Sequence, residues 1–319
     1  MSTFLVVGAG GVGRATAAVV AGQGHEVRLA SRSGTDPGLP GVTAVRVDAT
    51  NADQLSRLAS GAAAIINAVN PVYTRWATDW PPLATAFIRA AETSGAGLVI
   101  VGNLYAYGAV NGPITPELPL TSTGTKGQVR AQMWREALAA HQAGRVRAAE
   151  IRASDYFGPG AGPRVSYLNE FVLRPASRGK SVRLIIGAPD VPHSFTYLPD
   201  IATTAAAVAT SDVGWGRAWH VPTAPARTIR QVVDDVASIT GRPAVSIRTT
   251  PAWLRRTMGL VIPIVRELDE TAHQFERPFI VDSSATEAQL GLTATPWPQA
   301  LPATLQQQEQ SVKHPAGRS

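Results

Sequence analysis

Four glycines near the start of the chain have the spacing of a phosphate-binding turn. The run Gly8-Ala9-Gly10-Gly11-Val12-Gly13 follows an apolar run at residues 4–7 and precedes an Ala- and Val-rich segment that ends at Gly24. In a strand–turn–helix frame, Gly8 permits the tight turn, Gly10 lets a pyrophosphate approach the backbone, and Gly13 lets the helix pack closely on the strand. The helix N-terminus also offers free N–H groups. The pattern predicts a dinucleotide-binding turn formed by Gly8, Gly10, Gly11, Val12 and Gly13.

The residues that end the next three expected strands indicate which dinucleotide this turn would hold. Ser31 and Arg32 follow the second strand, where an NAD-binding chain normally carries an acidic residue for the ribose 2′-hydroxyl. A guanidinium matches phosphate oxygens, so Arg32 favours NADP(H) over NAD(H), although a solvated loop arginine would look the same. Asp48 ends the third strand and either contacts the adenine or forms a turn. Ala68 ends the fourth, in a segment that either meets the cofactor ribose or is a plain turn.

The elements that position these residues alternate between strand and helix. Apolar runs of strand length occur at residues 4–7, 25–30, 42–47, 62–68, 98–101 and 148–152. Helical segments separate them, and the longest are expected at residues 82–94, opened by Pro81-Pro82, and at residues 127–143. This alternation is typical of a doubly wound parallel sheet, where ligands bind outside the carboxyl ends of the strands. The sequence therefore predicts an α/β Rossmann-type fold with a cofactor-binding domain over residues 1–155.

The second half of the chain has a different composition. Pro and Gly cluster at residues 158–163 and 187–192, and several short helical segments follow. We expect a smaller substrate-binding lobe over residues 156–319, with the stretch at about 194–220 returning to the Rossmann core. The tail from Gln306 to Ser319 is polar and is expected to fray.

The composition excludes several kinds of protein. The 319 residues include no cysteine, which removes disulfides, thiolate catalysis and zinc–thiolate sites. The net charge of +6 is spread without a Lys/Arg-rich run, so nucleic-acid binding is not indicated. No apolar run has membrane-spanning length, no group of His, Asp and Glu has metal-ligand spacing, and no G-x-S-x-G elbow indicates a hydrolase. We therefore expect a cytoplasmic protein with a small-molecule substrate and no metal.

Several motifs, in the correct order, resemble those of one enzyme family. Asn103-Leu104-Tyr105-Ala106-Tyr107-Gly108 ends the fifth expected strand, residues 152–160 end the sixth, and residues 194–202 come later. With Lys126 ahead of the long helix, they resemble the extended short-chain dehydrogenases/reductases, the NAD-dependent epimerase/dehydratase family. The resemblance covers residues 3–300. It implies a nicotinamide cofactor in contact with Lys126, and a homodimer through the two long helices.

Two departures from the family pattern concern its chemistry. The glycine turn is G-x-G-x-x-G rather than G-x-x-G-x-x-G, because Arg14 stands at the last position. The family combines a Ser or Thr with Tyr-x-x-x-Lys, but here Ser122 stands four residues before Lys126 and the tyrosine is absent. The usual serine is replaced by Asn103.

The missing tyrosine leaves the proton donor open. Hydride transfer to a carbonyl builds negative charge on oxygen, which an acid must neutralise, and a serine hydroxyl is a far weaker acid than a phenol. The candidate catalytic residues are therefore Lys126 or Tyr105 as the acid, Asn103 as a hydrogen-bond donor to the carbonyl oxygen, and Ser122 in the tyrosine position. Alternatively, Tyr105 is a wall aromatic and Lys126 only binds the cofactor ribose.

Aromatic side chains and one histidine are candidates for the substrate site. Tyr73 and Trp76 either wall an apolar pocket or pack beneath a loop or in a dimer contact. If the resemblance holds, Tyr156, Phe157 and His193 face the region between the lobes.

Three functions agree with these residues. The first is an NADP(H)-dependent oxidoreductase acting on a small, partly apolar carbonyl-type substrate, and we favour it. The second is a sugar-nucleotide epimerase or dehydratase, which the arginines Arg164, Arg183 and Arg248 leave open. The third is a non-catalytic NADP(H) sensor, which the missing tyrosine supports.

Overall fold

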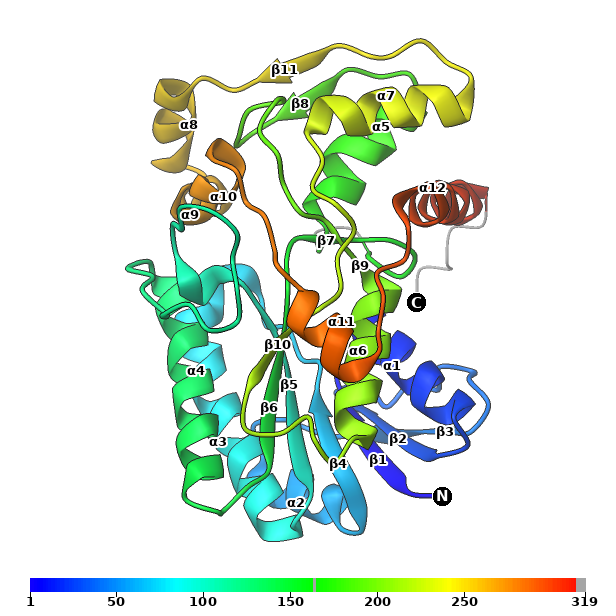
Figure 1. The fold of residues 1–319 in the computed structure, drawn as a ribbon, viewed down its shortest axis with the longest axis vertical. Helices are drawn as coiled ribbons and strands as arrows, with labels where there is room; N and C mark the ends of the chain where they lie inside the picture. Colours follow the sequence, from blue (N-terminus) through cyan, green and yellow to red (C-terminus); the bar gives the residue numbers. More distant parts are fainter. Residues whose placement is uncertain (163–164, 314–319) are drawn as a thin grey trace.

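A parallel sheet of seven strands organises the chain, as the computed structural model shows for the residues that it describes, 1–162 and 165–313 (Figure 1). In sheet order the strands are β10 (Ala218–His220), β6 (Ala148–Ala153), β5 (Gly97–Asn103), β4 (Ala62–Asn67), β1 (Thr3–Val7), β2 (Glu26–Ser31) and β3 (Val42–Arg46). Every neighbouring pair is parallel. The predicted Rossmann-type fold is therefore confirmed, and the strand order reverses beside β1, where doubly wound folds bind ligands.

Alternate side chains of the central strands face two different helical layers. Leu5 and Ile65 pack against α2 (Ala52–Ala59), α3 (Trp76–Ser94) and α4 (Thr125–Gln142). Phe4 and Ile66 pack on the opposite face against α1 (Gly11–Gly22) and α6 (Leu198–Thr210). Burial on both faces explains why these strands have apolar runs rather than alternating sequences.

A smaller lobe lies beyond the carboxyl ends of the strands (Figure 1). Its core includes Leu173, Val233, Phe275 and Leu301. The lobe contains the short strand pairs β7 (Tyr156–Phe157) with β9 (Thr196–Tyr197) and β8 (Val182–Leu184) with β11 (Ile247–Thr249). Its helical segments are a π-helical turn (Leu168–Leu173), α5 (Arg174–Ser177), α7 (Ile229–Thr240), α8 (Ala252–Gly259), α9 (Pro263–Thr271), α10 (His273–Glu276) and α12 (Trp297–Lys313). The chain returns to the sheet through α6 and β10, and α11 (Ser284–Leu290) lies beside β10.

Two expectations about helix ends are wrong. Helix α3 begins at Trp76, five residues before Pro81, because Trp76 and Trp80 are buried in the core and stabilise the turn ahead of the prolines. The polar tail does not fray from Gln306, because α12 continues to Lys313.

Apolar positions and glutamine side chains explain the persistence of α12. Leu301 and Leu305 bury one face of the helix. Oε1 of Gln307 accepts a hydrogen bond from the amide of Gly160, and Nε2 of Gln308 donates one to the carbonyl of Asn169. The last helix thus fixes the loop that follows β7.

Candidate functional site

The glycine turn joins β1 to α1 and has the close approaches expected of it. Gly8 has φ +110°, and a Cβ there would lie 2.5 Å from the carbonyl oxygen of Ala68. A Cβ on Gly13 would overlap the carbonyl oxygen of Gly8. In contrast, a Cβ on Gly10 would meet no atom within 4 Å. Gly8 and Gly13 therefore serve the fold, whereas the open space at Gly10 is what a bound phosphate would need.

A cavity of about 380 Å³ opens at the N-terminus of α1. It is lined by residues that include Gly10, Gly11, Arg14, Leu39 and Gly160. The N-cap of α1 is Gly10, which provides no side-chain hydrogen bond to the first turn. The free N–H groups of this turn and the cationic Arg14 make the cavity suited to an anion.

The residues expected at the adenosine end lie on exposed turns. Oγ of Ser31 accepts a hydrogen bond of 3.1 Å from the amide of Gly34, so this side chain shapes the turn after β2. Hydrogen bonds from the backbone and side chain of Thr50 lower the pKa of Asp48, and the charge of Arg32 also contributes. Asp48 thus forms the turn that was one of its two expected roles. Arg32 is exposed, with its charge available to solvent or a ligand.

Asn103 and Tyr105 lie at the carboxyl end of β5. Oδ1 of Asn103 accepts a hydrogen bond of 3.1 Å from the amide of Tyr105. The Tyr105 ring lies 5.8 Å from the ring of Trp76. The hydroxyl of Tyr73 lies 3.4 Å from Oγ1 of Thr271, and Tyr105 is close enough to Tyr73 to affect its pKa. Burial raises the pKa of Tyr73 to about 12 and that of Tyr105 well above its usual value. Both phenols therefore keep their protons at neutral pH.

Lys126 lies in the first turn of α4 and is only 2% exposed. Its ammonium group forms an ion pair with Glu267 and lies 3.7 Å from Oε2 of Glu270, both on α9. Its backbone amide also donates a hydrogen bond of 2.5 Å to Oε1 of Glu270. Nζ lies 4.4 Å from the ring centre of Tyr73. The structure thus brings together Lys126, Tyr73 and Tyr105, and surrounds the lysine with two carboxylates that sequence analysis missed.

Arg130 is a second buried cation on the same helix, and sequence analysis missed it too. It is 5% exposed, and its guanidinium carbon lies 4.6 Å and 4.3 Å from the ring centres of Trp76 and Trp80. Burial lowers its pKa to about 10, so it remains charged at neutral pH. Its Nε has no hydrogen-bond partner, and no carboxylate of the described residues forms an ion pair with it. Its Nη1 donates a hydrogen bond of 3.4 Å to the carbonyl of Val101, so Arg130 is a buried cation that no carboxylate balances within the described part of the chain.

Asp155 and His193 connect the sheet to the smaller lobe. Nε2 of His193 lies 3.1 Å from Oδ2 of Asp155, and Nδ1 lies 2.9 Å from the carbonyl oxygen of Gln274. The charge of Asp155 also raises the pKa values of Tyr73 and Tyr105. Asp155 thus lies near these phenols, and sequence analysis did not single it out.

Three other expected residues lie in different surroundings. Tyr156 is largely buried, which raises its pKa to about 12, and the charge of Arg130 acts on it. Phe157 belongs to the core of the smaller lobe. Ser122 precedes α4, and its hydroxyl lies against Gly127, where a Cβ would overlap it. The amide of Ser122 donates a hydrogen bond to the carbonyl of Ala106, and its side chain forms no hydrogen bond with Lys126.

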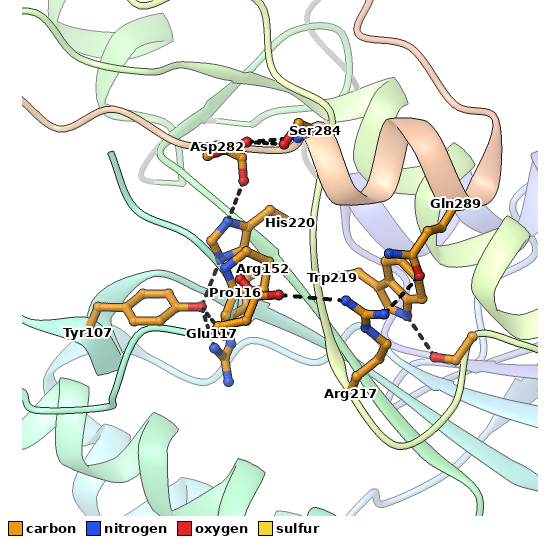
Figure 2. Close-up of polar contacts among 11 residues, drawn as sticks. Tyr107, Pro116, Glu117, Arg152, Arg217, Trp219, His220, Asp282, Ser284 and Gln289 are labelled. Atoms are coloured by element: carbon orange, nitrogen blue, oxygen red, sulfur yellow. Dashed lines mark hydrogen bonds and ion pairs between the residues drawn. The ribbon is translucent and has the colours of Figure 1, made fainter. Parts of the chain in front are cut away.

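The Tyr107 of the family-like Tyr107-Gly108 pair belongs to a buried polar network (Figure 2). Its hydroxyl lies 2.8 Å from Nε2 of His220 and accepts a hydrogen bond of 2.5 Å from Arg152. Nδ1 of His220 lies 2.9 Å from the carbonyl oxygen of Asp282, so this nitrogen carries the proton and Nε2 accepts from Tyr107. Nε of Arg152 donates a hydrogen bond of 2.6 Å to Glu150. The network joins the loop after β5 to the segment before α11 and thus has a structural role.

The described residues contain neither a cluster of metal ligands nor a helix that could span a membrane. No group of three or more His, Cys, Asp or Glu side chains there could hold a metal ion. Within the same residues, every helix is too short or too polar to cross a membrane.

Comparison with known proteins places this site in a family. The model of the NAD dependent epimerase/dehydratase family matches residues 4–221. No curated protein sequence matches the chain significantly.

Solved structures are similar over nearly the whole chain. MoeE5 in complex with UDP-glucose and NAD has a TM-score of 0.77 and 20% identity, with 97% of this chain and 99% of that chain covered. dTDP-glucose 4,6-dehydratase from Bacillus anthracis str. Ames, in complex with NAD, has a TM-score of 0.77 and 16% identity, with 98% of each chain covered. UDP-glucuronic acid 4-epimerase from Bacillus cereus, in complex with NAD, has a TM-score of 0.77 and 14% identity, with 97% and 99% covered. At these identities the likeness shows the fold, and the family model, which spans more than half of the sequence, shows that the chain belongs to the NAD-dependent epimerase/dehydratase family, a family of enzymes.

Proposed function

We propose that this protein is an NADP(H)-dependent oxidoreductase acting on a small, partly apolar carbonyl compound. The observation that carries the proposal is the juxtaposition of Lys126 with Tyr73 and Tyr105, in which the ammonium lies over the Tyr73 ring and the two phenols are near neighbours. Tyr73 and Tyr105 follow the carboxyl ends of β4 and β5, and Lys126 lies in the first turn of α4. A nicotinamide cofactor bound at the carboxyl ends of these strands would supply the hydride.

The proposed preference for NADP(H) rests on Ser31 and Arg32 at the end of β2. Neither residue is a carboxylate, and the guanidinium of Arg32 is exposed on the turn. A 2′-phosphate would therefore meet a cation there rather than an acid. The similar structures named above contain NAD, so direct comparison of the two cofactors is the decisive measurement.

The charge around Lys126 supports a substrate without a diphosphate. Two carboxylates, those of Glu267 and Glu270, already pair with Lys126. A sugar nucleotide brings two further negative charges, which these carboxylates would repel. The ring of Tyr73, which is partly exposed and packs on the buried Trp76, instead offers apolar surface.

The second candidate is a sugar-nucleotide epimerase or dehydratase. It is favoured by the family and by the sugar nucleotides in the similar structures. Arg183 and Arg248 are register partners on β8 and β11 and are both exposed, so they could meet phosphates from the smaller lobe. Arg164 lies outside the described residues.

The test is turnover with a matched panel of substrates. We expect oxidation of NADPH with small aromatic or aliphatic ketones and aldehydes, followed at 340 nm. Conversion of a UDP- or dTDP-sugar without net cofactor consumption would replace this proposal with the second candidate. Tight NADPH binding without turnover on either panel would identify a non-catalytic sensor.

We also propose the domain division and the assembly. The cofactor-binding domain comprises residues 1–155 and the substrate lobe comprises residues 156–319, with the stretch at about 194–220 returning to the core. Helices α3 and α4 pack side by side and are the proposed dimer surface. Light scattering after size-exclusion chromatography tests the dimer.

A further inference from the structure

Lys126 and Arg130 stand one helical turn apart on the buried face of α4. The family spacing Tyr-x-x-x-Lys is therefore also that of Lys126-x-x-x-Arg130, and the two side chains approach neighbouring members of one aromatic group. Lys126 lies over Tyr73, which packs on Trp76, and Arg130 lies over Trp76. Ser122, which has the family spacing to Lys126, precedes the helix. The helix thus offers a lysine in the tyrosine position and an arginine in the lysine position.

The carboxylates of α9 give Lys126 a route to solvent. The Lys126 side chain is 2% exposed, whereas those of Glu267 and Glu270 are 22% and 21% exposed. Glu270 is fixed by the amide of Lys126 and packs against Gly124, where a Cβ would lie 2.6 Å from its Cγ. Glu267 contacts Nζ directly. Glu267 is therefore the carboxylate best placed to exchange a proton with Nζ.

We propose that Lys126 is the catalytic residue that replaces the missing tyrosine in proton transfer, and that Glu267 is the positioning residue that restores its proton from solvent. The inference rests on the proposed oxidoreductase function. The tyrosines have a different part: burial raises the pKa values of both phenols, which keep their protons at neutral pH, and the Tyr73 ring holds the ammonium on its face.

The proton transfer balances as follows. The reduced nicotinamide supplies the hydride, which forms a C–H bond at the carbonyl carbon, and the C=O π pair moves to oxygen. The N–H bond of the Lys126 ammonium breaks and its proton goes to that oxygen, so an alcohol and a neutral amine result. Glu267 takes a proton from solvent and passes it to Nζ, which restores the ammonium–carboxylate pair. The sum is one carbonyl, one hydride and one proton giving one alcohol.

The composition of the chain permits a direct test of the pair. It contains three lysines, Lys126, Lys180 and Lys313, so protein labelled with [13C]lysine gives three side-chain Cε signals. Lys126→Arg assigns the first of these. We expect Glu267→Gln to move the Lys126 signal and to leave that of the exposed Lys180 in place. The matched control is Asp269→Asn, which changes a carboxylate on the same helix that pairs with Arg255, and it should leave the Lys126 signal where it is. An unmoved Lys126 signal in Glu267→Gln would overturn the pairing.

The kinetic test uses the same variants with NADPH and the best carbonyl substrate. Without the neighbouring negative charge the ammonium loses its proton more readily, so Glu267→Gln should move the alkaline limb of kcat to lower pH by about one unit and lower kcat about tenfold. The NADPH dissociation constant should stay within about twofold of the wild-type value. A merely structural role would not lower kcat while leaving the cofactor affinity unchanged. Lys126→Met should lower kcat by about 100-fold or more. Asp269→Asn should keep the wild-type pH profile.

Two negative results have different meanings. An active wild-type enzyme whose pH profile and kcat are unchanged in Glu267→Gln would overturn this inference and leave the oxidoreductase in place. A wild-type protein that turns over none of the carbonyls would overturn the proposed function and the proton-transfer role with it.

Discussion

Oδ2 of Asp155 lies 3.1 Å from Nε2 of His193, and the other nitrogen of this ring lies 2.9 Å from the carbonyl oxygen of Gln274. A carbonyl accepts hydrogen bonds only, and so does an ionised carboxylate. Both contacts are therefore satisfied only if the ring carries two protons or if Asp155 carries one. The ring is 1% exposed and stacks on Phe275, with centroids 4.3 Å apart. Asp155 and the carbonyl of Gln274 thus hold the ring from both of its nitrogens.

This arrangement of hydrogen bonds predicts the effect of Asp155→Asn. An amide at position 155 can donate to Nε2 of a neutral His193, while Nδ1–H donates to Gln274. We expect the variant to match wild-type thermal stability at pH 8, measured by circular dichroism. Asp155→Ala leaves Nε2 without a partner and should cost about 1–3 kcal/mol. Equal losses in both variants would contradict this arrangement.

The glycine turn predicts two opposite results from the same substitution. Gly10→Val places a side chain in open space where the pyrophosphate is expected, so NADPH binding should be lost while the unfolding temperature changes little. Gly13→Val overlaps the backbone of Gly8 and should destabilise the protein by about 3 kcal/mol or more. Calorimetric titration and thermal unfolding measure the two effects. Normal NADPH affinity in Gly10→Val would show that the phosphates bind elsewhere.

Arg32 predicts which cofactor binds more tightly. A charge-assisted contact with a 2′-phosphate contributes about 1.5–3 kcal/mol, so NADPH should bind at least about tenfold more tightly than NADH. Arg32→Glu should reverse this preference, because a carboxylate repels the 2′-phosphate of NADPH and accepts a hydrogen bond from the ribose 2′-hydroxyl of NADH. Arg242→Glu makes the same charge change at an exposed residue of the smaller lobe and should have no effect. Equal dissociation constants in the wild-type protein would contradict the NADP(H) proposal.

The sheet could be predicted from the sequence because each of its features depends on only a few consecutive residues. A buried strand beside β1 needs a continuous apolar run, and the turn after β1 needs Gly8 and Gly13, so both features are visible in a few residues. The start of α3 was mispredicted because the burial of Trp76 and Trp80 outweighs the local signal of Pro81.

The surroundings of Lys126 have no local signal. Glu267 is 141 residues away, and its helix reads as an ordinary amphipathic segment. Arg130 had a partial signal, since it stands four residues after Lys126. Its burial could not be anticipated, because arginines on helices are mostly exposed and only the facing rings of Trp76 and Trp80 accommodate this one.

The unpartnered Nε of Arg130 predicts a contact with the nicotinamide half of the cofactor. Arg130→Met should weaken NADPH binding about tenfold and leave the binding of 2′,5′-ADP, which lacks that half, unchanged. Arg130→Lys keeps the charge and should recover part of the affinity. This recovery would show that the weaker binding of Arg130→Met is not caused by unfolding. Arg135→Met on the exposed face of α4 is the control. Equal weakening of both ligands would place the effect of Arg130 on the fold instead.

His220 predicts a specific dependence of stability on pH. Burial lowers its pKa to about 4 from the usual 6.5, and the charge of Arg152 acts in the same direction. Below pH 6.5 the unfolded chain therefore binds a proton that the folded chain excludes. The free energy of unfolding should fall as the pH drops from about 6.5 to about 4, by on the order of 3 kcal/mol from this group, and should not depend on it above about pH 7.

Comparison of variants separates this contribution from that of the carboxylates, which titrate in the same range. We expect His220→Gln to be less stable than wild type at pH 7.5, because the bond from Tyr107 is lost or lengthened, but to lose less stability on acidification. The measurement is urea unfolding at intervals between pH 7.5 and pH 4.5. His25→Gln, at a histidine near the N-terminus and outside the Tyr107 network, should keep the wild-type dependence. If His220→Gln and wild type lost stability in parallel, the protonation of His220 would not oppose folding. The assignment of a hydrogen bond from the Tyr107 hydroxyl to a neutral His220 ring would then be wrong.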